Sequence, residues 1–257
     1  MTEKQAKKLF EKYNPADSVV RCPNGRAKMR KPLDLYARAA VNLYGIIRRD
    51  EFVEIFNSQN DEQTSVDEVF MILLPNVLKP SRWYGFYKDY IVHYAVLSNF
   101  DWVDHLEKNQ SDKPRYIPQK KEFLEYEWEW YVDHDHWKNF SDFMLDSFGC
   151  HTDIYKACSE IEISVTQTHS LNKLGEIMEE HNLVFKDEKH IQKFYDAIMT
   201  VMNNTRIWEN KGHTPEELMK IQASNPPKEP VLQQRIKAEP NQKCPCGSGK
   251  NISIAAN

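Results

Sequence analysis

Residues 83–97 read WYGFYKDYIVHYAVL, and this stretch decides the fold that the sequence predicts for the first third of the chain. Most of its residues are aromatic or β-branched, and such residues pack well on the half-buried surface of a sheet. The polar pair in its middle is Lys88 and Asp89. The stretch therefore predicts two strands joined by a turn at Lys88 and Asp89.

A helix is predicted well before this hairpin, in the run LDLYARAAVNLYGII, residues 33–47. Its apolar residues recur at the spacing of a single helical stripe. The members of that stripe are Leu35, Ala39, Leu43 and Ile46. We expect this stripe to face the core.

Two shorter helices are predicted between that run and the hairpin. The segment DEFVEIFNS, residues 50–58, places Phe52 and Phe56 on one side of a helix. Ser65 and Glu68 stand in the relation of a capping box before the apolar run VFMILL, which marks the start of the third helix. Three helices followed by a hairpin is the element order of a winged helix, so we expect a winged-helix-like N-terminal domain.

The chain is predicted to be helical from there to residue 222. The expected helices cover residues 100–109, 118–132, 137–148, 153–167, 171–181 and 188–203. A last helix has a strong start signal, with Thr214 as N-cap, Pro215 as the first helical residue and Glu217 completing a capping box. The predicted fold class is mostly α with a small β-hairpin (α+β), followed by a disordered tail.

Four parts are expected along the chain. They are a helix-rich winged-helix-like domain over residues 1–110, a helical domain over 111–222, a proline-rich linker over 223–243 and a C-terminal motif over 244–257. The linker holds four of the 13 prolines and little that is apolar, which is typical of an extended, semi-rigid spacer.

The formal net charge of −4 hides an uneven distribution of charge along the 257 residues. Residues 1–50 carry 12 Lys and Arg against 5 Asp and Glu, residues 51–160 sum to −11, and residues 161–257 sum to zero. So small a net charge argues against a general polyanion binder. Because the five cysteines are odd in number and the N-terminus is charged throughout, we expect a cytoplasmic protein with reduced thiols and no membrane partner.

The loop RCPNGRAKMRK, residues 21–31, carries five positive charges and no acid. One hypothesis is that it contacts the phosphates of DNA or ribosomal RNA; the alternative is a solvated loop that balances the acidic middle of the chain. The candidate contact residues are Arg21, Arg26, Lys28, Arg30 and Lys31. The third predicted helix is acidic at its start and apolar afterwards, so contact with protein, or dimerisation, is at least as well supported as base reading.

The last residues, 243–257, read KCPCGSGKNISIAAN. A Cys-x-Cys pair on a tight turn offers two thiolates to one metal ion, whereas a structural zinc site needs four ligands. Apart from Cys244 and Cys246, no Cys or His occurs after His213. These two cysteines are therefore half of a zinc site.

The stretch CPCGSGK resembles the SEC-C motif, the zinc-binding element first described at the C-terminus of the SecA preprotein translocase. The family pattern is Cys-x-Cys, eight residues, and then Cys followed by Cys or His; here the second pair falls on Ala255 and Ala256. The resemblance implies a bacterial protein whose intact form binds zinc and uses this motif to contact a ribosome, a chaperone or a nucleic-acid complex. With half of the ligands missing, this chain is expected to hold no zinc.

A single lost nucleotide would account for both missing ligands. If residues 251–257 are encoded AAT ATA AGC ATT GCT GCG AAT, one A restored before them gives Lys-Tyr-Lys-His-Cys-Cys-Glu, an ordinary SEC-C ending. The hypothesis is a frameshift or a sequencing error after Lys250, and the DNA sequence at that codon tests it. Engineered replacement of cysteine by alanine is the competing explanation.

Two interpretations remain open for the segment KEFLEYEWEWYVDHDHW, residues 121–137. It is either an acidic, aromatic docking surface for a basic partner or an amphipathic helix with its aromatic residues in the core. His134 and His136 have metal-ligand residue types, but a His-x-His pair needs an extended backbone to point both rings the same way, and this pair lies at a predicted helix end.

The sequence makes no positive case for an enzyme. The function we expect is a non-enzymatic adaptor or binding protein with a protein or ribonucleoprotein partner. One alternative is a winged-helix DNA-binding regulator that uses the basic loop. Another is a metal-dependent enzyme that uses the region of His134 and His136.

Overall fold

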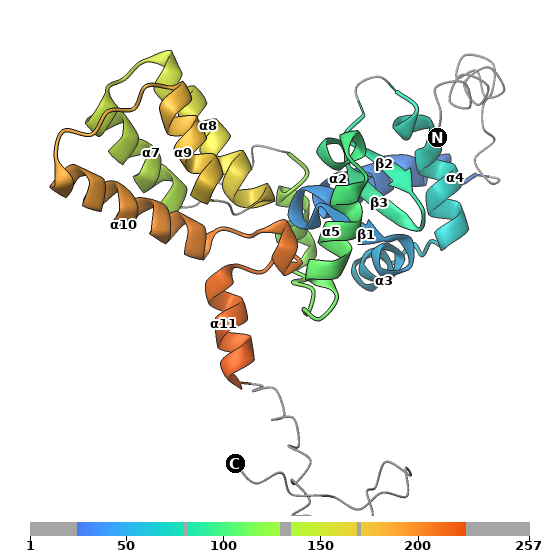
Figure 1. Ribbon diagram of the computed structural model, residues 1–257. Coiled ribbons are helices and arrows are strands. Elements are labelled where there is room, and N and C mark those ends of the chain that lie inside the picture. Colours follow the sequence, from blue (N-terminus) through green and yellow to red (C-terminus); the bar gives the residue numbers. More distant parts are fainter. Residues whose placement is uncertain (1–24, 80–81, 129–134, 169–170, 225–257) are drawn as a thin grey trace, which may run out of the picture. The chain divides into compact units, whose positions relative to one another are not determined.

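Residues 25–79, 82–128, 135–168 and 171–224 are described by the computed structural model of the chain. They form a mostly helical protein with a small three-stranded antiparallel sheet, which confirms the predicted fold class (Figure 1). The chain divides into two compact units, and the boundary between Leu218 and Met219 lies within its last helix. None of the helices in the described residues is long and apolar enough to cross a membrane.

The first part of the fold is built around one long helix, α2, and the sheet. Its elements in chain order are the 3₁₀ helix η1 (Arg26–Met29), α2 (Arg30–Tyr44), β1 (Ile46–Arg48), α3 (Arg49–Gln59), α4 (Val66–Val77), β2 (Tyr84–Tyr87), β3 (Tyr90–His93) and the 3₁₀ helix η2 (Tyr94–Ser98). From α2 to β3 the order is helix, strand, helix, helix, strand, strand, and β3 lies between β1 and β2. The predicted order of three helices and a hairpin is confirmed.

The prediction for the first helix is wrong at its C-terminal end. Gly45 adopts φ +72°, its amide donates to the Val41 carbonyl at 2.8 Å, and α2 stops at Tyr44. Ile46 then enters β1 and pairs with Val92 of β3, so the sheet has a third strand that the sequence did not predict. The two isoleucines of β1 fit the end of a helical stripe and a short strand equally well.

The predicted hairpin is confirmed, with its turn at Lys88 and Asp89, but its second strand is shorter than predicted: β3 ends at His93, and Tyr94–Ser98 form the 3₁₀ helix η2. Lys88 takes φ +49°, a conformation that two-residue hairpin turns require. The backbone amide of Arg49 donates to the Asp89 carbonyl at 2.9 Å, and the Arg49 guanidinium donates to the Asp89 carboxylate at 2.9 Å. The start of α3 is therefore fastened to the hairpin tip.

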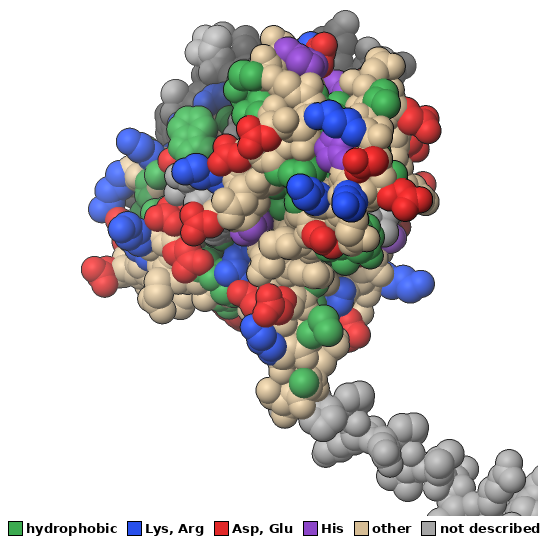
Figure 2. All heavy atoms as spheres, turned by 90° about the vertical axis from the view of Figure 1, so that its left-hand side faces the viewer, with side chains coloured by type: hydrophobic (Ala, Val, Ile, Leu, Met, Phe, Trp, Pro, Cys, Tyr) green, Lys and Arg blue, Asp and Glu red, His purple; other side chains and the backbone are tan. Residues whose placement is uncertain are grey.

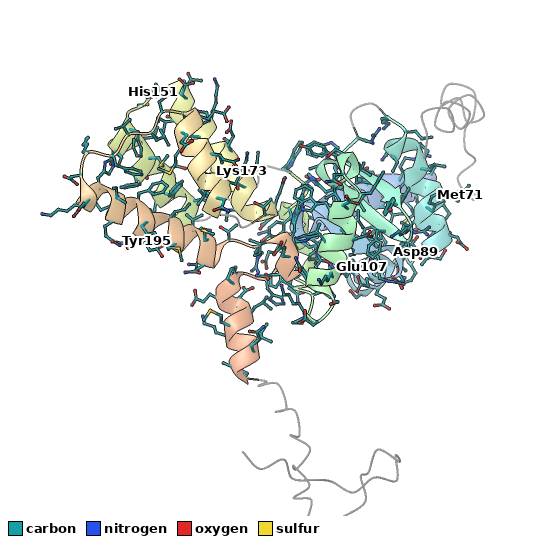
Figure 3. The ribbon with its side chains drawn as sticks, viewed as in Figure 1. Met71, Asp89, Glu107, His151, Lys173 and Tyr195 are labelled. Atoms are coloured by element: carbon teal, nitrogen blue, oxygen red, sulfur yellow. The ribbon has the colours of Figure 1, made fainter. Side chains whose placement is uncertain are left out.

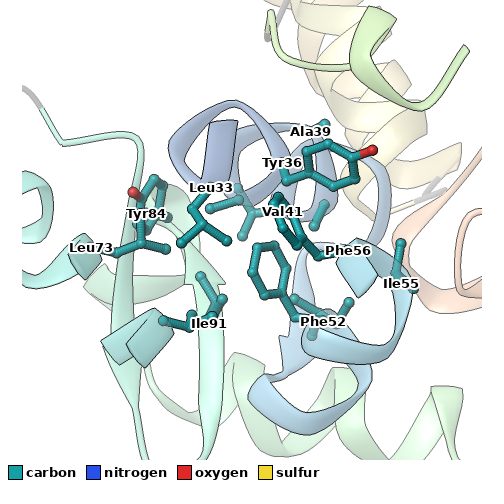
Figure 4. Packing of buried hydrophobic residues seen from close by; sticks show 14 of the residues in the cluster. Leu33, Tyr36, Ala39, Val41, Phe52, Ile55, Phe56, Leu73, Tyr84 and Ile91 are labelled. Atoms are coloured by element: carbon teal, nitrogen blue, oxygen red, sulfur yellow. The ribbon is translucent and has the colours of Figure 1, made fainter. Parts of the chain in front are cut away.

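A single hydrophobic cluster joins α2 to the sheet, α3 and α4 (Figure 4). The rings of Tyr36 and Phe56 meet edge to face at 4.9 Å between centroids, and Phe52 and Leu33 are fully shielded from solvent. Each side chain of this size contributes about 1.5–3 kcal/mol when it is fully buried. α2 is therefore the element on which this part of the fold depends.

The rest of the described chain is helical. Its elements are α5 (Asp101–Gln110), α6 (Lys120–Glu125), α7 (Asp135–Phe148), α8 (Thr152–Gln167), α9 (Leu171–Glu180), α10 (Glu188–Asn204), the 3₁₀ helix η3 (Trp208–Asn210) and α11 (Pro215–Ser224). These bounds follow the predicted helices except at α6, which was expected to continue to residue 132 but ends at Glu125. The Tyr126 and Glu127 amides there donate to the carbonyls three residues back, the bonding of a turn that closes a helix.

Buried hydrophobic residues outside the first cluster form two further clusters. One lies among α7, α8, α9 and α10 and includes Trp137, Phe140, Ile161 and Phe194. The other lies beside the sheet and α5, and Trp208 belongs to it. The chain thus returns to its first part after α10.

Glu162 on α8 gives a testable dependence of stability on pH. Burial raises the pKa of its carboxyl group to about 7 from the ordinary value of 4.5. The folded state then binds more protons than the unfolded state between these two values, so the free energy of unfolding falls as the pH rises through that window. We expect a loss of about 3 kcal/mol, because each pKa unit corresponds to about 1.4 kcal/mol.

Chemical denaturation of the wild type, Glu162→Gln and Glu179→Gln near pH 4.5 and near pH 7.5 checks this expectation. Glu162→Gln should lose most of the difference in unfolding free energy between the two pH values. Glu179 is an exposed carboxylate, and its variant should keep the difference. Equal pH dependence in the wild type and Glu162→Gln would contradict the account.

Candidate partner-binding face

The third helix of the winged-helix-like order, α4, begins with the predicted cap. The Ser65 hydroxyl accepts a hydrogen bond from the Glu68 amide at 3.3 Å, which satisfies one of the free donors of the first turn. The Glu68 carboxylate binds Arg26 through two contacts, 2.8 Å from Nη2 and 3.1 Å from Nε. The start of α4 is thereby tied to η1, 42 residues earlier in the chain.

Two described residues of the basic loop, Arg26 and Lys28, lie close to acids of the same protein. Besides Glu68, Arg26 pairs with Glu62 at 3.2 Å and donates to the Gln63 carbonyl. Lys28 pairs with Glu62 at 3.0 Å, although its side chain is 69% exposed. These ion pairs neutralise two of the positive charges that were candidates for phosphate contact.

The other candidate residues of the loop differ in position. The Arg30 guanidinium donates to the Ile72 carbonyl of α4 at 3.3 Å, and Lys31 is exposed. Arg21 lies outside the described residues. Contact of this loop with nucleic acid stays a prediction.

The outward side of α4 is largely apolar. We define the α4 face as Asp67, Phe70, Met71 and Leu74, which follow one another at helical spacing on the side away from the buried Val69, Ile72 and Leu73. Met71 is 39% exposed and lies on the outer side of the helix (Figure 3). Phe70 and Leu74 are half-buried.

Phe70 is held in place from two sides. Its ring lies 4.9 Å from that of Phe86 on β2, and the Arg49 guanidinium carbon lies 5.6 Å from its centroid. Arg49 is also paired with Asp89 at the hairpin tip, which Figure 3 labels. Phe70 is therefore already positioned by Phe86 and Arg49, and such preorganisation lowers the entropic cost of binding a partner.

The hairpin tip adds little free positive charge. Lys88 pairs with Asp104 of α5 at 3.1 Å, and Tyr87 stacks on Phe100 with centroids 4.4 Å apart. Phe100 is 40% exposed. In a wing that holds nucleic acid, unpaired cations would face the phosphates. Here the charge of Lys88 is already matched.

The acidic, aromatic segment 121–137 is divided between core and surface. Phe123 and Tyr126 are buried, as the amphipathic interpretation predicts. Trp128 is 55% exposed, and its ring meets Trp83 edge to face at 6.3 Å, with the Arg38 guanidinium carbon 5.8 Å from the Trp128 centroid. The docking interpretation keeps support only at Trp128, because residues 129–134 lie outside the described part.

The candidate metal residues are not brought together in the described structure. His136 is half-buried on α7, with Nε2 3.4 Å from the Thr205 hydroxyl, and His134 lies outside the described residues. Among the residues that the structure describes, no group of three or more His, Cys, Asp or Glu is arranged to hold a metal ion. Cys158 packs beside α7, and burial raises the pKa of its thiol to about 11.

The proposed zinc ligands lie beyond the described residues as well. This applies to Cys244 and Cys246 and to the positions of the missing second pair, Ala255 and Ala256. The zinc half-site therefore remains a prediction from the sequence.

A polar cluster near the end of the first unit was not predicted. The Arg206 guanidinium carbon lies 3.5 Å from the centroid of the Tyr116 ring, and its nitrogens donate to the Tyr126 hydroxyl at 3.1 Å and to Glu217 at 2.8 Å. Burial alone would raise the pKa of the Glu217 carboxyl, but the hydrogen bonds from Arg206, Thr214 and His213, together with the charge of Arg206, outweigh burial and lower that pKa. His213 lies 3.2 Å from the same carboxylate, and burial lowers its pKa.

This polar cluster also includes the cap at the start of α11, the last described helix. Glu217 also accepts from the Thr214 amide at 3.2 Å, while the Thr214 hydroxyl accepts from the Glu217 amide at 3.1 Å, so the predicted capping box is confirmed. Only this local signal was present in the sequence. The partners of Arg206 lie 80 and 11 residues away, and no spacing rule connects them.

Comparisons of the chain with protein-family models, with curated proteins and with solved structures found no match.

Proposed function

We propose that this chain is a non-enzymatic binding protein, an adaptor, that docks a partner protein on the α4 face. The observation that carries the proposal is the chemistry of α4 in its surroundings. The helix presents Phe70, Met71 and Leu74 on its outer side, with the exposed carboxylates of Asp61 and Asp67 nearby in the chain. A partner with apolar side chains flanked by lysine or arginine complements such a surface.

Electrostatics favours protein over nucleic acid as the partner of α4. In a winged helix that reads DNA, the third helix enters a groove between rows of phosphates. Asp67 at the start of α4 would repel those phosphates, whereas Arg26 and Lys28 are paired with Glu62 and do not add free positive charge. A DNA-binding regulator is thus the second candidate, supported by the order of its elements.

The C-terminal motif supplies the second contact in this proposal. In the intact form, zinc would be held by Cys244, Cys246 and a cysteine pair at the positions of Ala255 and Ala256. The resemblance to the SEC-C family supports a ribosome, a chaperone or a nucleic-acid complex as the partner class. The predicted linker started two residues too early, because α11 continues to Ser224; the proline-rich residues 225–243 would give this contact reach beyond the folded part.

Site-directed variants test the proposal for the α4 face. Met71→Glu places a charge in the middle of the apolar surface, and we expect it to weaken binding of the partner at least tenfold, because a buried unpaired carboxylate is costly at an interface. Val184→Glu is the matched control, since Val184 is 76% exposed and far from α4 in sequence. The measurement compares how much of the same partner the wild type and the two variants capture. Each of the three proteins is made in two forms, one with the C-terminal sequence of this chain and one with cysteines at positions 255 and 256.

The result that contradicts the proposal is capture that Met71→Glu leaves intact. The DNA-binding alternative makes the opposite prediction. Reversal of the exposed Lys28 and Lys31 to Glu should then abolish a salt-sensitive shift of DNA, and Met71→Glu should not. Arg26 is unsuited to this test, because its replacement also breaks the contact with Glu68.

A further inference from the structure

The described residues begin beside the α4 face. Arg26, in the first turn of η1, binds Glu68 of α4 at 2.8 Å, and the Arg30 guanidinium donates to a backbone carbonyl of α4 one turn further on, at 3.3 Å. Glu68 precedes Met71 by three residues, a spacing at which side chains on a helix are neighbours. Residues 1–24 lie outside the described part of the chain, and they therefore join the fold at the edge of the α4 face.

The sequence of residues 4–13, KQAKKLFEKY, has the pattern of an amphipathic helix. Its apolar residues recur at the spacing i, i+3, i+4 and i+7, which places them on one side of a helix. Partner helices that bind an apolar surface use anchors at this same spacing. The apolar residues are Ala6, Leu9, Phe10 and Tyr13, and the lysines around them are Lys4, Lys7, Lys8 and Lys12.

The α4 face complements this pattern in apolar surface and in charge. Phe70, Met71 and Leu74 supply the apolar surface. Asp61 and Asp67 are exposed, and within the described residues neither carboxylate has an ion pair. Four lysines against one glutamate give residues 4–13 the opposite charge, so the two surfaces attract each other.

The helices α7 and α10 offer a less suitable surface for a basic segment. Figure 2 looks onto the side of the molecule that includes them, where acidic and basic side chains are interspersed. Lysines that approached this side would meet repulsion as well as attraction. Charge complementarity therefore favours the α4 face.

The connection between residues 4–13 and η1 is long enough to reach the whole of α4. Residues 14–24 form this connection, and when extended they span about 36 Å at about 3.3 Å per residue. The 12 residues of α4 are about 18 Å long. A short tether of this kind holds the segment near the face at an effective concentration of about 1 mM.

We infer that residues 4–13 pack on the α4 face as an amphipathic helix and compete there with the partner. The inference rests on the proposed function, because it takes the α4 face to be the surface that docks the partner. Leu9 and Phe10, the large residues in the middle of the apolar stripe, would cover Met71. The lysines would lie against the two exposed carboxylates. An isolated helix of this length is marginal in water, so the contact and the helix would form together.

The size of the competition follows from the tether. A segment with a Kd of about 0.2 mM for the face would occupy it about five-sixths of the time at an effective concentration of about 1 mM. The apparent affinity for the partner falls in proportion to the fraction of chains with a free face. Loss of the contact should therefore strengthen partner binding about sixfold.

The methyl resonance of Met71 in the full chain, labelled at methionine and free of partner, tests the contact. Met71 is 39% exposed, and a phenylalanine ring packed on it would displace this resonance. The double variant Leu9→Glu, Phe10→Glu should therefore move the Met71 resonance. The resonance of Met144, which is buried among α7, α8, α9 and α10, should stay in place. An added peptide of residues 3–14 should return the Met71 resonance of the variant to its wild-type position.

The matched control is Val19→Glu, Val20→Glu, which adds the same two charges within the connection. It should leave the Met71 resonance where the wild type has it. An unmoved resonance in the Leu9→Glu, Phe10→Glu variant, or equal movement in the control, would overturn the inference. So would a wild-type resonance that changes over a ~20-fold range of protein concentration, because a contact within one chain is independent of concentration and such a change would assign the face to a second copy.

Capture of the partner separates this inference from the proposed function. The Leu9→Glu, Phe10→Glu variant should capture the partner about sixfold more tightly than the wild type. If Met71→Glu weakens capture but the Met71 resonance does not respond to the double variant, the inference is wrong and the proposed function stands. If the resonance responds but Met71→Glu leaves capture intact, the proposed function is wrong and the contact within the chain stands.

Discussion

Replacement of Trp208 by alanine should lower the free energy of unfolding by about 3–5 kcal/mol, the range observed when a large aromatic side chain is removed from a core. Trp208 is 2% exposed, and its indole N–H donates to the Asn42 carbonyl at 2.8 Å across 166 residues of chain. Its ring packs against His93 at 4.8 Å and Trp102 at 5.9 Å. The substitution therefore leaves a cavity and an unpaired carbonyl where the end of the first unit meets α2.

Urea denaturation monitored by circular dichroism measures this effect. The matched control is Trp128→Ala, because Trp128 is 55% exposed and its loss should change the unfolding free energy by less than about 1 kcal/mol. Similar losses in both variants would show that Trp208 does not connect the two ends of the first unit in the way described.

Replacement of Gly45 by alanine should destabilise the fold by about 3 kcal/mol or more. Gly45 has φ +72°, a conformation that costs an L-residue about 1–2 kcal/mol. An added methyl group would also lie 2.6 Å from Cδ2 of Trp208, and overpacking of a core typically costs another 1–3 kcal/mol. The conformation is required because Gly45 ends α2 and turns the chain into β1.

Gly175→Ala is the matched control for this substitution. Gly175 lies within α9, where a methyl group would meet no atom within 4 Å. Alanine is favoured over glycine in a helix by about 0.5–1 kcal/mol, so this variant should be slightly more stable than the wild type. The melting temperatures of both variants, compared with that of the wild type, test these two expectations. A Gly45→Ala protein that melts at the wild-type temperature would contradict the described packing around Trp208.

Much of the fold could be predicted because its signals are local. The cap of α4 at Ser65, the capping box of Thr214 and Glu217, and the hairpin turn at Lys88 each depend on residues within four positions. The strand β1 was missed because its three residues acquire their conformation by pairing with β3, more than 40 residues later. Short strands depend on such distant partners more than on their own composition.

The candidate face could be predicted only in part. The acidic start and apolar remainder of α4 were visible in the sequence, and they favoured contact with protein as much as base reading. The ion pairs of the basic loop could not be predicted from the sequence, because Arg26 comes close to Glu62 and Glu68 only when the chain folds.

A photo-crosslinking amino acid in place of Met71 tests the central proposal most directly, because it reports the chemical class of whatever touches the α4 face. The same group in place of Val184 is the control position. We predict that position 71, and not position 184, forms one dominant crosslink to a protein, and that the product disappears when Phe70→Glu is added. A crosslink from position 71 to nucleic acid, or equal products from both positions, would contradict the account.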